Sequence, residues 1–200
     1  FARDGTLAGF ADPDAAWVPG RIEGGLRMNP DGAAADDVVL VPHDDGLDFS
    51  TSLEFTLAVW VNGSPTQDNG AGVLAKGTGN GGEQFALDVY QPVAGQAGRY
   101  RFYVRTTSGA AAVYPTSVAP NNTWQHVVAV FSVPLQRVKV YVNGAEVLSG
   151  TPPASLLQTA HELTIGARQS TSGAYDLNFD GTVDDVRVFG RALTPADVME

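Results

Sequence analysis

Short segments in which apolar and polar side chains alternate recur along the whole chain. Residues 85–90 carry Phe85, Leu87 and Val89 at every second position, and residues 99–106 follow the same rhythm. A period of two predicts β-strands with two chemically different faces. Turn residues separate such segments about every eight to twelve positions, and Asn143-Gly144 is typical of a tight hairpin. No helical pattern extends beyond the last few residues, so the chain is predicted to be all-β, either a sandwich or a barrel.

Composition narrows the classes of partner and chemistry. The 200 residues fit one large all-β domain over 1–200 better than two small ones. The formal net charge is −10, with only two lysines, Lys76 and Lys139, which argues against nucleic acid as a partner. The absence of cysteine excludes disulfides, thiolate catalysis and cysteine-ligated zinc. No apolar run reaches the length of a membrane span, so membrane insertion is not expected.

The C-terminal segment combines several local signals. Asp180-Gly181 predicts a turn, and residues 183–189 alternate as a strand does. Thr194-Pro195-Ala196-Asp197 predicts a helix start, with Thr194 as N-cap and Asp197 at N3. In one-letter code, residues 179–198 read F-D-G-T-V-D-D-V-R-V-F-G-R-A-L-T-P-A-D-V.

This segment resembles the closing strand of LamG-like domains, the laminin-G-type, concanavalin A-like jelly rolls. The family pattern there is F-x-G-x-I-D-D/E-V-R-I-Y-x-R-A-L-S-x-x-E-I. Other segments resemble further family strands in the right order, namely residues 24–28, 47–61, 124–131, 140–144 and 163–167. The resemblance covers nearly the whole chain and implies an all-β, two-sheet antiparallel β-sandwich of about 10–14 strands.

The resemblance also implies a class of function. The expected protein is a non-catalytic carbohydrate-binding or adhesion module, extracellular or at the cell surface, binding a polysaccharide, a glycan or a cell-surface protein. We expect a monomeric module of a longer protein, because the chain starts abruptly at Phe1 with no signal peptide. The same fold hosts unrelated functions, so two alternatives stay open: a structural or protein-interaction spacer, and a polysaccharide lyase or glycoside hydrolase.

One strand face is the candidate ligand-binding surface. Alternation places Asp88 and Tyr90 on one face of their strand, and Arg101, Tyr103 and Arg105 on one face of the next. Tyrosine and arginine suit stacking and hydrogen bonding to sugars. The same residues with His126 would form the one enzyme site the sequence allows, that of a lyase. The alternative is a polar sheet face without a ligand.

A calcium ion is expected from the resemblance. Many concanavalin A-like domains bind one structural Ca²⁺ where an Asp of the final strand meets the loop after an early strand. The matching residues are Asp184 and, in the loop, Asn29 and Asp31. Residues 176–184 also resemble the start of an EF-hand loop, but Arg187 stands where a bidentate acid is required, so an EF-hand is not predicted.

Other motifs give weaker signals. Residues 77–82 satisfy G-x-G-x-x-G, but a strand-like segment follows, which favours a flexible hairpin loop over a dinucleotide site. The glutamates are scattered and show no paired-carboxylate motif for glycoside hydrolysis. Trp17, Trp60 and Trp124 are expected in the core rather than as sugar platforms.

Overall fold

The computed structural model describes residues 4–29, 37–171 and 173–199. Its strands are β1 (Thr6–Ala8), β2 (Trp17–Pro19), β3 (Gly24–Met28), β4 (Val38–Val41), β5 (Glu54–Gly63), β6 (Ala71–Thr78), β7 (Gly82–Tyr90), β8 (Arg99–Arg105), β9 (Ala111–Pro115), β10 (Trp124–Ser132), β11 (Arg137–Val142), β12 (Ala145–Gly150), β13 (Leu163–Ile165), β14 (Ala167–Arg168), β15 (Leu177–Asn178) and β16 (Gly181–Phe189). A 3₁₀ turn, η1 (Asp45–Leu47), and a short helix, α1 (Pro195–Val198), complete the described elements.

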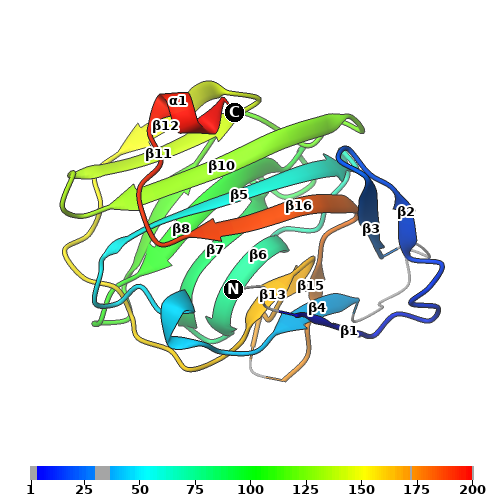
Figure 1. The fold of residues 1–200 in the computed structure, drawn as a ribbon, viewed down its shortest axis with the longest axis horizontal. Coiled ribbons are helices and arrows are strands. Elements are labelled where there is room, and N and C mark those ends of the chain that lie inside the picture. Colours follow the sequence, from blue (N-terminus) through cyan, green and yellow to red (C-terminus); the bar gives the residue numbers. More distant parts are fainter. Residues whose placement is uncertain (1–3, 30–36, 172, 200) are drawn as a thin grey trace.

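The strands form two sheets packed face to face (Figure 1). Sheet A has the order β1-β4-β13-β6-β7-β8-β9, and β14 and β15 attach beside β6. Sheet B has the order β12-β11-β10-β5-β16-β3-β2. Nearly all pairings are antiparallel, which confirms the two-sheet antiparallel sandwich expected from the sequence. The elements that the sequence did not reveal are the shortest, such as β14 and β15, because two residues cannot display an alternation.

The core between the sheets is built around Phe55 in the middle of sheet B. Its ring lies 4.7 Å from that of Phe49, 4.8 Å from Phe85 and 5.3 Å from Phe131. Phe85 comes from sheet A, so these contacts join the two layers. Aromatic pairs at such distances add to the free energy gained by burying apolar area.

The C-terminal segment covers part of the outer face of sheet B. Leu193 and Val198 pack against Ala58, Val128 and Tyr141, which point away from the main core. The predicted helix start is confirmed, because the Thr194 side chain accepts the Asp197 N–H and the Asp197 carboxylate accepts the Thr194 N–H. Figure 1 shows α1 on the same side of sheet B as the residues of β10 and β11 that Val198 packs against.

The glycine-rich motif of the sequence has a clear outcome. The G-x-G-x-x-G segment is the β6–β7 hairpin, where Asn80 and Gly81 adopt positive φ angles, so the hairpin interpretation is confirmed. In the part of the chain that the structure describes, no helix is both long and apolar enough to cross a membrane.

Replacing Phe55 by alanine tests the central aromatic packing. Phe55 is fully buried and contacts rings from both sheets, so Phe55→Ala should lower the free energy of unfolding by about 3–5 kcal/mol. Denaturant unfolding followed by circular dichroism measures the change. Leu135→Ala is the control, because Leu135 is 49 % exposed and its loss should cost no more than about 0.5 kcal/mol. Equal effects of the two variants would contradict this description of the core.

Buried tyrosines predict a loss of stability at high pH. Burial raises the pKa of Tyr114 to about 12, and burial also raises the pKa of Tyr100 and Tyr103. The unfolded chain therefore loses phenolic protons above about pH 10 while the folded chain keeps them. The stabilisation is complete below that pH and is lost as the pH rises further. Unfolding free energies measured between pH 9 and 12 should fall steeply, and Tyr114→Phe should reduce the slope; a flat profile would contradict the burial.

Candidate functional site

The five predicted ligand-binding residues lie together on the outer face of sheet A. β7 and β8 are neighbours, with Asp88 opposite Arg101 and Ala86 opposite Tyr103. The alternate side chains of both strands, among them Leu87 and Phe102, face the sandwich core. The strand alternation therefore directs the apolar set inward and the arginines and tyrosines outward, as the sequence predicts.

A buried carboxylate, that of Asp88, orients two arginines. Arg101 donates from Nε to Asp88 Oδ1 at 2.9 Å and from its terminal nitrogen to Oδ2. Arg168, on β14, lies with Nε 3.2 Å from the same Oδ2. Asp88 is 0 % exposed, so both guanidinium groups are needed to compensate a charge withdrawn from water.

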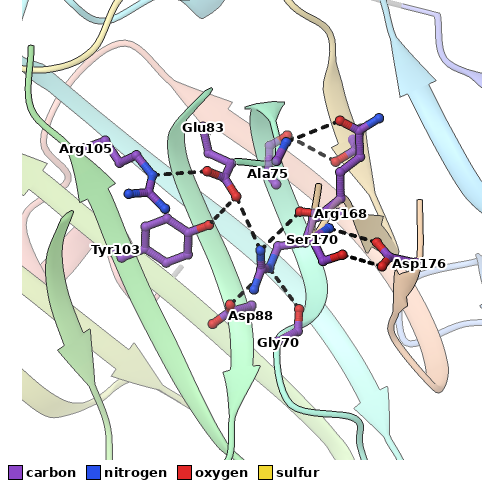
Figure 2. A network of polar contacts seen from close by, with 12 residues as sticks. Gly70, Ala75, Glu83, Asp88, Tyr103, Arg105, Arg168, Ser170 and Asp176 are labelled. Carbon is purple, nitrogen blue, oxygen red and sulfur yellow. Dashed lines mark hydrogen bonds and ion pairs between the residues drawn. The ribbon is translucent and has the colours of Figure 1, made fainter. Parts of the chain in front are cut away.

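A second buried carboxylate, that of Glu83, repeats the arrangement (Figure 2). Arg105 Nε is 3.1 Å from Glu83 Oε2, and Arg168 Nη1 is 3.3 Å from Oε1. The Tyr103 hydroxyl donates to the same Oε1 at 3.0 Å. Arg168 thus bridges the two carboxylates, and it also donates to the carbonyl oxygen of Gly70 at 2.9 Å.

Sequence reasoning did not identify Glu83 and Arg168 as site residues. The ladder between β6 and β7 shifts register next to Gly77, and this irregularity places Glu83 on the outer face with Asp88. Arg168 lies on a two-residue strand that joins the sheet beside β6. Neither a local bulge nor a two-residue strand produces a periodic pattern in the sequence. The one available signal was the glycine-rich turn directly before Glu83, since such turns often accompany irregular strand pairing.

Tyr103 lies at the centre of the three arginines. Their guanidinium carbons are 5.3 Å (Arg101), 5.8 Å (Arg105) and 5.9 Å (Arg168) from its ring centroid. Arg101 also lies 4.6 Å from the ring of Tyr90. Burial raises the pKa of Tyr103, so its hydroxyl stays protonated at neutral pH. Burial opposes the charge of Arg101, but the hydrogen bonds and negative charge of Asp88 outweigh this and raise its pKa.

The cluster forms an open, locally cationic hollow, which we name the arginine–tyrosine face (Glu83, Asp88, Tyr90, Arg101, Tyr103, Arg105, Arg168). Three guanidinium groups against two carboxylates leave a local charge of +1 in a chain of −10. The hollow has a volume of about 250 Å³ and is bordered by Val113, which is 48 % exposed. Both carboxylates are buried and ion-paired, so the groups available to a ligand are the arginines and an apolar side chain.

His126 does not join this face. It lies on β10, in sheet B, opposite Trp60 of β5. The six-residue lyase constellation considered from the sequence is therefore divided between the two sheets. A sequence does not show which sheet a strand joins, and for this reason His126 was grouped with residues of the other sheet.

The expectation of three core tryptophans is wrong. Trp17 is 58 % exposed, and Trp60 and Trp124 are half-buried on the outer face of sheet B. In β5 both faces are semi-apolar, so alternation could not show which residues point outward.

The predicted calcium ligands are not assembled by the described residues. Asp184 accepts the backbone N–H groups of Arg21 and Ile22 at 2.7 and 2.6 Å through one oxygen, Oδ2. Asn29 follows Met28 at the other end of the β3–β16 ladder from Asp184. The two residues are therefore about 13 Å apart along the strands. Asp31 lies outside the described residues.

The surroundings of Asn29 nevertheless contain oxygen ligands. Asn29 donates its N–H to Asp37 Oδ2 at 3.1 Å, and its own side-chain oxygen is buried without a hydrogen bond from a described residue. Within residues 4–29, 37–171 and 173–199, no group of three or more histidine or acidic side chains could hold a metal. Calcium binding therefore stays a prediction, and Asp37 joins Asn29 as a candidate ligand.

Known proteins share this architecture. A family model described as the concanavalin A-like lectin/glucanases superfamily matches residues 31–199. No curated protein sequence matches the chain significantly.

Several solved structures are similar at low sequence identity. Domain 4 of AbnA, a GH43 extracellular arabinanase from Geobacillus stearothermophilus in complex with arabinotriose, is 19 % identical with a TM-score of 0.66, over 98 % of this chain and 81 % of that one. The binding domain of Paraclostridial Mosquitocidal Protein 1 is 16 % identical, with a TM-score of 0.65, over 92 % and 44 %. A putative carbohydrate binding protein from Bacteroides ovatus is 18 % identical, with a TM-score of 0.65, over 88 % and 45 %.

At such low identities the structural similarity shows a shared fold alone, and the chain spans less than half of the last two structures. The family model covers most of the sequence and agrees with the two-sheet architecture. The chain therefore belongs to the concanavalin A-like lectin/glucanases superfamily.

Proposed function

We propose that this chain is a non-catalytic carbohydrate-binding module that holds glycans on the arginine–tyrosine face. The observation that carries the proposal is the set of three arginines around Tyr103, held by two buried carboxylates beside an open hollow. Two structures with similar folds support it, the arabinanase domain in complex with arabinotriose and the putative carbohydrate binding protein from Bacteroides ovatus. The proposal includes a monomeric module outside the cell or at its surface.

The geometry suits recognition of hydroxyl and carboxylate oxygens. Guanidinium groups present several N–H donors in one plane and can bind a carboxylate through two hydrogen bonds. Because Asp88 and Glu83 already orient the arginines, a ligand would not have to order them, which lowers the entropic cost of binding. The local charge of +1 favours glycans with acidic groups, such as uronic acids.

The state of the acids supports the non-catalytic part of the proposal. Glycoside hydrolysis needs one carboxyl group as acid and another as base or nucleophile, both open to the substrate. Here Asp88 and Glu83 are almost fully buried and accept arginine hydrogen bonds. In this proposal their role is to position cations for the ligand.

Arg105→Gln tests the binding face. Arg105 is partly exposed, and its partner Glu83 keeps Arg168 and Tyr103, so the fold should survive the change. A charged hydrogen bond is worth about 1.5–3 kcal/mol, so affinity for polygalacturonate should fall by roughly 10- to 150-fold. Calorimetry with polygalacturonate and with arabinan measures the change.

The matched control is Arg137→Gln at the start of β11 in sheet B, which should bind as the unaltered chain does. Equal losses in both variants, or no binding of any glycan by the unaltered chain, would contradict the proposal. Release of shortened sugars during the titration would overturn its non-catalytic part.

We further propose that a calcium ion is held near the end of β3 by Asn29 and Asp37 and stabilises the fold. The buried Asn29 side-chain oxygen supports this position, and Ca²⁺ prefers carboxylate and amide oxygens. In this proposal Asp184 has a different role, since its Oδ2 accepts two backbone N–H groups.

Calcium at 100 times its dissociation constant should stabilise the fold by about 2.7 kcal/mol, which raises the melting temperature by roughly 5–10 °C. Scanning calorimetry with Ca²⁺ and with chelator measures this shift. Asp37→Asn should abolish the shift. Asp184→Asn should lower the melting temperature under both conditions and leave the shift intact. A shift lost only in Asp184→Asn would restore the ligand expected from the sequence.

A further inference from the structure

A second hollow lies on the opposite side of the sandwich, on the outer face of sheet B. It has a volume of about 440 Å³ and is lined by Arg21, Trp60, Trp124, His126, Asn143 and Met199, among others. We propose that this hollow is a second carbohydrate site, independent of the arginine–tyrosine face, and that it takes a sugar residue carrying one carboxylate.

The floor of the hollow is a stack of flat side chains. Trp60 and His126 stand opposite each other on β5 and β10, with ring centroids 5.0 Å apart and planes at 23°. The Arg21 guanidinium, from the β2–β3 connection, lies 5.0 Å from the Trp60 ring. Trp124 belongs to the same face of β10, two positions before His126. Trp124 is half-buried and no described ring or guanidinium stacks on it, so its indole offers an apolar surface on which the C–H face of a sugar ring can stack.

The walls come from segments far apart in the sequence. The β11–β12 turn is fixed against the floor, because Asn143 Oδ1 accepts the His126 N–H at 2.8 Å and the Asn143 N–H donates to the His126 carbonyl at 2.8 Å. Val198 and Met199, at the end of α1, form another side, and Met199 is highly exposed. A smaller hollow of about 160 Å³ continues from this one and shares Trp60, His126 and Met199.

The charges in the larger hollow select the kind of sugar. Arg21 is its only charged lining residue, and among the described residues it forms no ion pair. Burial lowers the pKa of His126, so its imidazole is neutral at neutral pH, and no described residue hydrogen-bonds to the ring. The Arg21 guanidinium can bind one carboxylate of a sugar, while the neighbouring indoles contact the C–H face of the sugar ring.

The packing of sheet B shows why this area is open. The C-terminal segment covers Val128, Val130 and Tyr141 on the same outer face. It ends its contacts beside Trp60 and Trp124, which stay half-buried. Trp60 and Trp124 thus differ from their covered neighbours on β5 and β10 in being only half-buried, with Arg21 lying over Trp60 and with Val198 and Met199 at the border of the hollow.

Tryptophan fluorescence separates this site from the arginine–tyrosine face. The chain has three tryptophans, and two of them line this hollow, whereas the arginine–tyrosine face has none. Titration with oligogalacturonate should give a saturable fluorescence change. The methyl-esterified oligomer, which lacks the negative charge, should bind at least about tenfold more weakly.

Arg21→Gln should weaken the fluorescence-detected binding by at least about tenfold. Arg105→Gln and Arg137→Gln should leave it unchanged. Arg105→Gln distinguishes a failure of this inference from a failure of the proposed function, because that variant weakens the arginine–tyrosine face and leaves Arg21 in place.

Three results would overturn the inference. Binding seen by calorimetry without a tryptophan signal would eliminate the second site while leaving the proposed function in place. Equal binding of the methyl ester would eliminate the carboxylate selectivity. A fluorescence change that persists in both Arg21→Gln and Trp124→Phe would place the ligand outside this hollow.

Discussion

The burial of Asp88 and Glu83 is the constraint on which the organisation of the arginine–tyrosine face depends. A carboxylate withdrawn from water is costly unless cations and hydrogen-bond donors compensate it. Arg101, Arg105 and Arg168 provide this compensation, and Arg168 joins both carboxylates. The arginines are thereby held at defined positions over Tyr103, which a set of exposed, independent arginines would not be.

The same compensation makes the three arginines unequal. Removing one partner of a buried ion pair costs about 3–5 kcal/mol, because it leaves a buried charge unpaired. Asp88 receives two hydrogen bonds from Arg101, so loss of Arg101 would disturb the fold as well as the face. Glu83 has three partners, and the loss of Arg105 leaves two of them. Arg105 is therefore the arginine whose removal separates binding from stability.

The sequence was sufficient for the residues of regular strands and insufficient for the others. Alternation in residues 85–90 and 99–105 placed Asp88, Tyr90, Arg101, Tyr103 and Arg105 on one face, because the period of a strand decides which way a side chain points. Glu83 and Arg168 depend on a register shift and on a two-residue strand, which have no period. His126 and Trp60 depend on which sheet a strand joins, and that is decided by long-range pairing.

Both hollows are local cationic areas on an acidic molecule. At physiological ionic strength an exposed charge is screened over about 8 Å, so a bound sugar senses the nearest guanidinium groups more than the total charge of −10. The arginine–tyrosine face and the Arg21 hollow lie on outer faces of opposite sheets. One short oligosaccharide cannot reach both, whereas a long acidic polymer could be held by two molecules or at two points. The acidic remainder of the surface opposes non-specific adhesion of that polymer elsewhere, so selectivity arises from the positions of the arginines in the two hollows.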